Sequence, residues 1–177
     1  MVVGILGLTM ALGFSGCQSE NQKNQDAYRK IGINSMAEGD YDKAVKSFQK
    51  ALDTSLGKIG AEEIDICYYK AAAQFAKKDY DGAIETYTSL IDYDKENANA
   101  YYLRGSVYLD TDKKDKAFKD YKNAVKYAGR EYEIYEGIYE NLTNKGETEE
   151  AKNYLKKALD IKPKDGADYA EQGHVYY

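Results

Sequence analysis

The feature that most constrains this chain is a residue pattern that returns along its length. Alanines that follow a polar turn recur at Ala44, Ala83, Ala117 and Ala151, at intervals of 39, 34 and 34 residues. A period of about 20–50 residues is typical of stacked repeats, in which each unit buries its apolar face against its neighbours. We therefore expect an array of similar units rather than one central core.

The clearest copy of the pattern occupies residues 98–129. Apolar and small residues stand at helical spacing in both of its halves: Ala98, Tyr101, Gly105, Tyr108 and Leu109, then Ala117, Tyr121, Ala124, Val125 and Ala128. The polar run 110–115 separates the two halves. This arrangement predicts two amphipathic helices joined by a turn, and not the calcium loop that the aspartates of the run suggest at first.

The other copies vary the same pattern. The first has Tyr28, Ile31, Gly32, the turn Gly39-Asp40, then Ala44, Phe48 and Ala51; the second has Cys67, Ala71, Tyr80, Ala83, Tyr87 and Leu90; the fourth has Tyr135, Ile138, Leu142, Gly146, Ala151, Leu155, Ala158 and Pro163. Lys70 and Gln74 make the second copy the most divergent, and its surplus residues 59–63 predict a longer loop or an extra helical turn. Tyr139 stands where the other copies have a small residue, which weakens the expected helix pairing in the fourth.

Together these positions resemble the tetratricopeptide repeat family from about Gln25 to Tyr177. The resemblance implies an all-α, helix-turn-helix solenoid that forms a right-handed superhelical array. Its repeats fall at about 25–58, 64–97, 98–131 and 132–165, followed by a terminal helix at 166–177. That helix either caps the stack or begins a further repeat.

The first residues predict an export signal. Residues 1–16 carry no charge and are mostly apolar, about the length of a signal-peptide core and too short for a membrane-spanning helix. The segment Phe14-Ser15-Gly16-Cys17 resembles a bacterial lipobox, although Phe14 replaces the usual Leu and no basic residue precedes the apolar run. The resemblance implies a lipoprotein signal peptide at 1–16, lipidation of Cys17, a polar tether at 17–24, and anchoring at the extracytoplasmic face of the cell membrane. The alternative is a signal peptide or short anchor without lipid.

Composition excludes several classes of function. A formal charge of -5 disfavours nucleic-acid binding, and the two cysteines lack metal-site spacing. Cys67 is expected to fill apolar space, and His174 is the only histidine, so we predict no enzyme, metal or cofactor. The chain has 19 tyrosines, and we assign to the core Tyr28, Tyr41, Tyr80, Tyr87, Tyr101, Tyr108, Tyr121, Tyr135, Tyr169 and Tyr176.

The resemblance also implies a concave ligand groove, lined by the first helix of each repeat. The candidate groove residues in this chain are Arg29, Ile33, Tyr68, Phe75, Tyr102, Ser106, Leu109, Glu133, Glu136 and Glu140. The aromatic ones are suited to gripping a peptide, and the three glutamates share one helix face. They indicate either a preference for a basic segment or an ordinary solvated face. Ile33 and Leu103 exclude the family's clamp for a C-terminal carboxylate.

Two functions remain open. The first is a membrane-tethered scaffold at the cell envelope that holds a protein or peptide in the groove. The second is a structural or assembly component that self-associates or docks through the terminal helix at 166–177. The sequence does not name the partner in either case.

Overall fold

The computed structural model describes residues 20–166, and within this range the chain forms eight α-helices and no strands. They are α1 (Glu20–Ala37), α2 (Tyr41–Asp53), α3 (Ala61–Ala76), α4 (Tyr80–Tyr93), α5 (Ala98–Asp110), α6 (Lys114–Ala128), α7 (Tyr132–Asn144) and α8 (Thr148–Leu159). The expected all-α fold is confirmed. The signal segment, Cys17, His174 and nearly all of the expected terminal helix lie outside the described residues.

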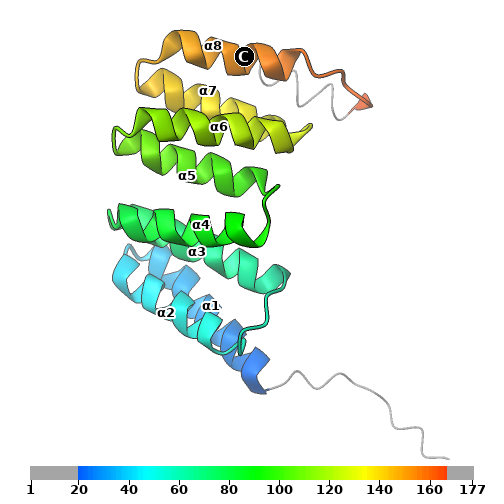
Figure 1. The fold of residues 1–177 in the computed structure, drawn as a ribbon. Coiled ribbons are helices and arrows are strands. Elements are labelled where there is room, and N and C mark those ends of the chain that lie inside the picture. The colour runs from blue at the N-terminus through cyan, green and yellow to red at the C-terminus, as the bar shows by residue number, and fades with distance from the viewer. Residues whose placement is uncertain (1–19, 167–177) are drawn as a thin grey trace, which may run out of the picture.

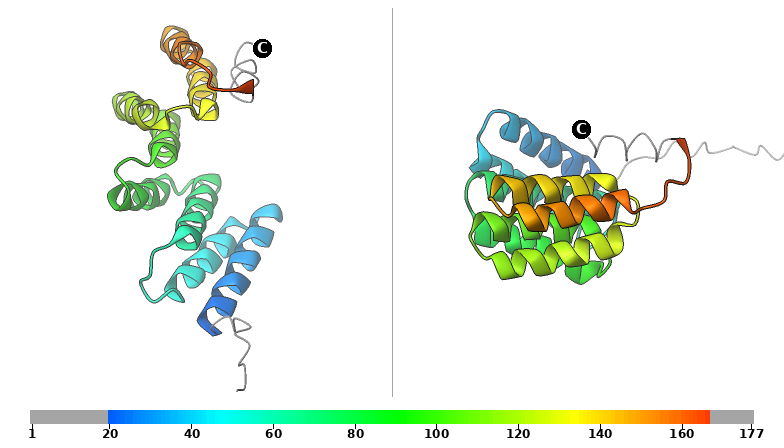
Figure 2. Two further views of the ribbon diagram at one scale, coloured as in Figure 1. Left: turned by 90° about the vertical axis from the view of Figure 1, so that its right-hand side faces the viewer. Right: turned by 90° about the horizontal axis from the view of Figure 1, so that it is seen from above.

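Consecutive helices pair as antiparallel hairpins, and the hairpins stack in a row (Figure 1). The side view places the odd-numbered helices along one side of the row and the even-numbered helices along the other (Figure 2). The start of α1 and the connections at 54–60, 94–97 and 129–131 lie along one edge, which we call the inter-repeat edge. The short turns within hairpins lie at the opposite edge.

The two helices of a hairpin approach closely where the sequence places a glycine. A Cβ at Gly32 would come within 2.5 Å of the Phe48 ring, and one at Gly105 would come within 2.8 Å of the Tyr121 ring. Both rings are fully buried. The small residue and the large ring are therefore one packing unit, because any side chain on the first would displace the second.

The two inner odd-numbered helices, α3 and α5, are each shared between two core clusters. Ile66 and Ala73 of α3 pack with Ala44, Phe48 and Ala51 of α2, whereas Ala71, on another face of α3, packs with α4. In the same way α5 contributes Val107 to the second cluster and Leu109 to the third, which runs through α5–α8. The core is thus a chain of overlapping clusters, as nearest-neighbour stacking requires.

Of the tyrosines assigned to the core, Tyr87, Tyr121 and Tyr135 are buried. Tyr28, Tyr41, Tyr80, Tyr101 and Tyr108 are half-buried, and Tyr169 and Tyr176 lie outside the described part of the chain. Tyr132 and Tyr154 are buried as well, although the repeat pattern did not assign them.

Three local expectations are changed by the structure. Helix α1 begins at Glu20, inside the segment expected to be a tether, and Gln25 is buried with its Nε2 donating to Glu63 Oε1 at 2.7 Å. Ile31 was assigned to the repeat core but is 41% exposed, because no described helix covers that face of α1. The surplus residues 59–63 were expected to form either a longer loop or an extra helical turn, and the structure shows both. A seven-residue connection, 54–60, joins α2 to α3, and α3 begins at Ala61, before the expected start of the second repeat at residue 64.

Other expectations agree with the fold. Residues 111–113 form the turn between α5 and α6. Cys67 is half-buried against the second core cluster, and burial raises the pKa of its thiol, which disfavours the reactive thiolate. In contrast, Tyr139 was expected to weaken the pairing of α7 with α8, but it packs half-buried against the third cluster and the two helices pair.

Candidate functional site

The candidate groove residues lie on α1, α3, α5 and α7, and we call the surface that these helices form the odd-helix face. Arg29 of α1 is engaged with α3: its Nε donates to Asp65 Oδ2 at 3.0 Å, and its Nη2 bonds to the same oxygen. The guanidinium also lies 5.4 Å from the centre of the Tyr69 ring. The bond to Asp65 raises the pKa of Arg29. Arg29 therefore holds two repeats together and is not a free cation for a ligand.

Tyr68 of α3 reaches the next repeat. Its hydroxyl donates to Asn97 Oδ1 at 2.6 Å, and the same oxygen accepts the backbone N–H of Ala100 at 2.9 Å, which caps α5. Burial raises the pKa of Tyr68, the bond to Asn97 lowers it, and the carboxylates of Asp94 and Glu131 raise it further. One face of the ring is thus used for stacking repeats while acidic groups surround the hydroxyl.

Tyr102 of α5 makes the corresponding contact with α7. A Cβ at Gly137 would lie 2.7 Å from Tyr102 Cζ, so the ring fits against α7 only because residue 137 has no side chain. Burial raises the pKa of Tyr102, the Asn141 and Ser106 side chains lower it, and the Glu140 carboxylate raises it. Tyr102 remains half-buried, with part of its surface open to solvent.

Ser106 and Leu109 take part in this packing rather than in a free surface. Ser106 Oγ donates to the Tyr102 carbonyl at 2.9 Å and accepts from Asn141 Nδ2 at 2.8 Å. Leu109 is 2% exposed and belongs to the core, so its prediction as a groove residue is wrong. Leu109 also stands in the apolar spacing of the repeat, and the structure supports that assignment. The repeat pattern left Ser106 unassigned, and the following repeat binds it through Asn141.

Ile33 and Phe75 are also half-buried. Ile33 packs against the first core cluster, and the Phe75 ring meets that of Tyr80 edge-on at 5.6 Å. Each therefore offers only part of its surface to a ligand.

The glutamates of α7 are the open part of the odd-helix face. Glu133 and Glu140 are exposed, and Glu136 is half-buried. Glu133 lies four residues before Gly137 and Glu140 three residues after it, so these two flank the face that meets Tyr102, and Glu136 lies between them one step further around the helix. The structure thus brings the candidate acidic and aromatic residues of α5 and α7 together.

Sequence reasoning missed three residues that hold this surface: Asn97, Gly137 and Asn141. A glycine inside a helical pattern signals close backbone approach, and Gly137 carried that signal. The two asparagines carried none, because an exposed polar residue is the ordinary expectation on a helix.

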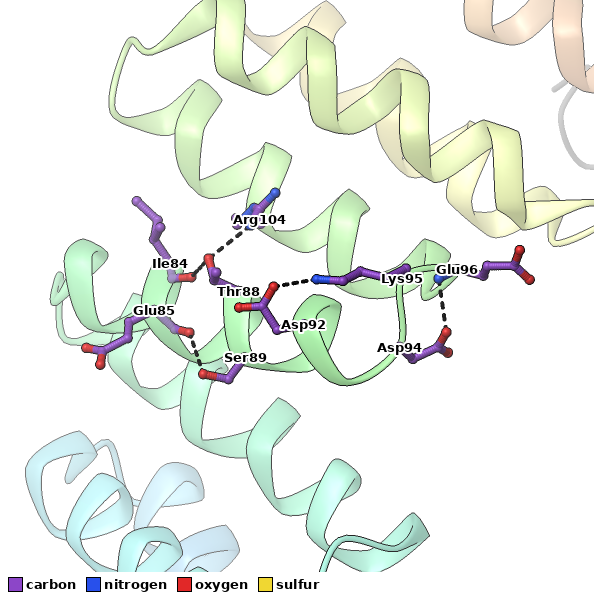
Figure 3. A network of polar contacts seen from close by, with 9 residues as sticks. All are labelled: Ile84, Glu85, Thr88, Ser89, Asp92, Asp94, Lys95, Glu96 and Arg104. Carbon is purple, nitrogen blue, oxygen red and sulfur yellow. Dashed lines mark hydrogen bonds and ion pairs between the residues drawn. The ribbon is translucent and has the colours of Figure 1, made fainter.

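The connection between α4 and α5 is fixed by polar contacts, drawn in Figure 3. Arg104 Nη1 donates to Thr88 Oγ1 at 2.9 Å, Lys95 Nζ donates to Asp92 Oδ1 at 2.6 Å, and the Glu96 N–H donates to Asp94 Oδ1 at 2.9 Å. Arg104 also pairs through Nε and Nη2 with the two carboxylate oxygens of Asp120, at 2.7 and 2.9 Å. These contacts set how the third repeat sits on the second.

Two classes of site find no support in the described residues. Between 20 and 166, no group of three or more His, Cys, Asp or Glu side chains is placed to hold a metal ion. In the same part of the chain, no helix combines the length and apolar character needed to cross a bilayer.

Comparisons with known proteins agree with this geometry. Models described as tetratricopeptide repeat match residues 29–87, 98–130 and 140–165, and a model described as TPR repeat matches 71–112. Among curated protein sequences, none gives a significant match.

Several solved structures have the same fold. MamA superposes with a TM-score of 0.62 at 24% identity, over 85% of this chain and 81% of that one. A MamA fragment from Desulfovibrio magneticus RS-1 gives 0.61 at 22%, over 80% and 76%. A thermophilic TPR protein from Thermus thermophilus gives 0.60 at 18%, over 86% and 81%. At these identities the likeness shows the fold alone. The family matches, which together span most of the described helices, show that the chain is a tetratricopeptide repeat protein.

Proposed function

We propose that this protein is a membrane-tethered lipoprotein that acts as a binding scaffold at the cell envelope and holds a basic segment of a partner protein on its odd-helix face. The observation that carries the proposal is the packing of the half-buried Tyr102 ring against Gly137 of α7, close enough to the Glu140 carboxylate for that charge to raise the pKa of Tyr102. We propose no catalytic role.

The charge of the face determines the kind of partner. Acidic residues on the odd-numbered helices include Asp26, Asp65, Asp110, Glu133, Glu136 and Glu140. Two of them already have a basic partner, since Asp65 pairs with Arg29 and Asp110 with Lys145. The neighbouring carboxyl of Asp26 also raises the pKa of Glu62, which is a sign of crowded negative charge. A ligand rich in lysine or arginine would relieve this repulsion.

The tyrosines supply a second attraction. A cation over the face of an aromatic ring is stabilised by the ring quadrupole, and stiff aromatic side chains lose little entropy on binding. Because the pKa of both Tyr68 and Tyr102 is raised, their hydroxyls stay neutral at physiological pH. The tyrosines thus carry no charge of their own. The carboxylates of the odd-helix face steer the basic partner, and the tyrosine rings add contact area.

The binding test changes charge without touching the core. In cells, the protein would be crosslinked and its partners identified by mass spectrometry for the wild type and for Glu133→Lys/Glu140→Lys. We expect the double variant to lose basic partners, because both residues are exposed on the odd-helix face.

The matched control is Glu149→Lys/Glu150→Lys, which makes the same charge change at two exposed positions on α8. It should keep the partners. The binding proposal fails if both double variants recover the same proteins as the wild type while their circular dichroism is unchanged.

The tether has its own test. The resemblance of Phe14-Ser15-Gly16-Cys17 to a lipobox supports it, and these residues lie outside the described part of the chain. The intact mass of the protein extracted from membranes should include a diacylglyceryl group, and Cys17→Ser should remove it and release the protein from the membrane fraction. An unmodified mass for the wild type would refute the anchor and leave the binding face unaffected.

The second candidate, assembly through residues 166–177, depends on residues that the structure does not describe beyond 166. It carries no part of this proposal.

A further inference from the structure

The connection between α2 and α3 exposes two large apolar side chains. Leu56 is 75% exposed and Ile59 is 57% exposed, within four residues of each other. Tyr93, at the end of α4, is 55% exposed on the same inter-repeat edge. Single exposed apolar residues are ordinary on protein surfaces, but a cluster at one edge of an otherwise polar array marks a contact surface.

The backbone holds this connection in a defined shape. Thr54 Oγ1 donates to the Ala51 carbonyl at 2.6 Å, and Ser55 Oγ donates to the Leu52 carbonyl at 2.8 Å. At the other end, the Gly60 N–H donates to Glu63 Oε2 at 2.8 Å. The connection is therefore tied to both flanking helices, and its apolar side chains are presented in a fixed place.

Leu56 itself has a backbone conformation that its residue type disfavours. Its φ is 53°, in the left-handed region, and Gly57 follows with a φ of 78°. A branched, apolar residue is uncommon there, because its Cβ crowds the backbone. Such a residue at the exposed tip of a fixed loop gains nothing for the fold, which points to a role outside it.

The position of the loop identifies what it meets. It lies beside the first turns of α1, and the two segments enclose a shallow, open cavity of about 390 Å³ lined by Asn21, Gln22, Leu56 and Ile59 among others. Figure 1 shows the connection next to the start of α1. Two residues separate Cys17 from Glu20, so the three steps along the chain between them span at most about 11 Å when fully extended. A lipid on Cys17 therefore brings the bilayer surface to this loop.

We infer that Leu56 and Ile59 insert into the bilayer surface and orient the anchored protein with its inter-repeat edge toward the membrane. This inference rests on the lipid anchor of the proposed function. The occupant of the apolar patch is the acyl region just below the lipid headgroups. The charged residues that line the cavity are one basic residue, Lys58, and two acidic ones, Glu62 and Glu63. Because acidic groups predominate, the contact is apolar in origin and does not need anionic lipid.

The chain has no tryptophan, which allows a site-specific test. The full-length variants Leu56→Trp and Ile59→Trp would be produced in a bacterial host, purified from membranes and reconstituted in phosphatidylcholine vesicles with or without brominated acyl chains. Bromine quenches only those indoles that enter the bilayer. We expect strong quenching and a blue-shifted emission for both variants.

The matched control is Glu38→Trp, an exposed position in the turn at the other end of α1. Because α1 has 18 residues, this turn lies about 27 Å from the start of the helix. Its emission should be several-fold less quenched than that of the loop variants.

The outcomes separate the two proposals. Consider first protein whose mass shows the acyl group. If its tryptophan is quenched equally at all three positions, or is not quenched at the loop, the orientation is overturned and the anchor remains. A dimer in light scattering of the purified protein that becomes a monomer in Leu56→Glu/Ile59→Glu would mean that a second copy covers the patch, which also overturns the inference. Absence of the acyl group from the purified protein overturns the anchor and this orientation with it.

Discussion

At the scale of single residues, packing between repeats depends on a few tightly fitted pairs. Gly137 and Tyr102 are one such pair, since a Cβ at residue 137 would lie 2.7 Å from Tyr102 Cζ. The pair joins α5 to α7 across the boundary between two repeats. It also places Tyr102 near the Glu140 carboxylate, so a structural contact shapes the candidate binding surface.

We predict that Gly137→Ala lowers the free energy of unfolding by about 1–2 kcal/mol. Overpacking a tight contact costs about 1–3 kcal/mol, and the better helix propensity of alanine returns up to about 1 kcal/mol. In a Tyr102→Phe background the cost should fall, because the missing hydroxyl gives the ring room to move. Urea unfolding of both single variants and the double variant measures this coupling. Additive effects would show that the two residues do not meet.

Polar residues that broke the repeat pattern are explained at the same scale. Gln74 stands where an apolar residue was expected and is buried, yet its Oε1 accepts a hydrogen bond from Thr86 Oγ1 at 2.8 Å.

In the fourth repeat, Tyr139 occupies the small-residue position, and Leu155 stands where the other repeats have Phe48, Tyr87 and Tyr121. A smaller partner leaves room for a larger first residue, so the volume of the pair is kept.

At the scale of helices, the hairpins differ in how their second helices begin. Asp40 and Asp79 accept hydrogen bonds from the backbone N–H groups of Lys43 and Gly82, at 3.0 and 3.1 Å, and so cap α2 and α4. Lys113, at the same position before α6, makes no side-chain cap. Its backbone angles, φ -89° and ψ 57°, are close to those of Asp79, φ -82° and ψ 68°.

We therefore predict that Lys113→Asn stabilises the protein by about 1 kcal/mol, the usual value of an N-terminal cap. The backbone already has the geometry that the capping side chain needs. Thermal unfolding followed by circular dichroism should show a higher midpoint for Lys113→Asn but not for Lys113→Ala, which removes the same lysine without adding a cap. A gain in both variants would mean that removing the lysine, rather than capping, is the cause.

At the scale of the whole molecule, buried tyrosines run through the stack. Burial raises the pKa of Tyr121 to about 12, and burial also raises the pKa of Tyr87, Tyr135 and Tyr154. In the unfolded chain these phenols ionise near pH 10. Between about pH 10 and 12 the unfolded state therefore binds fewer protons than the folded state, so stability falls as pH rises.

We predict that the free energy of unfolding is steady near neutral pH and drops above about pH 10, with Tyr121 alone contributing roughly 1 kcal/mol per pH unit between pH 10 and 12 and the other buried tyrosines acting in the same direction. Urea unfolding across this pH range measures the slope. Tyr121→Phe should make the slope shallower, whereas Tyr93→Phe, at an exposed position, should leave it unchanged. A slope that is identical in all three proteins would contradict the assignment of the effect to burial.

The sequence by itself determined the repeat unit. Its period, the paired helices and the fit of Gly32 against Phe48 and of Gly105 against Tyr121 all follow from contacts within one hairpin, which local spacing encodes. Only the tertiary structure decided which residues the next repeat covers. Leu109 is buried although the family resemblance implied a place in the ligand groove, and Ile31 is exposed although the pattern assigned it to the repeat core. The physical reason is that the rotation between hairpins depends on many side chains at once, so exposure at a repeat boundary is not encoded by spacing within one repeat.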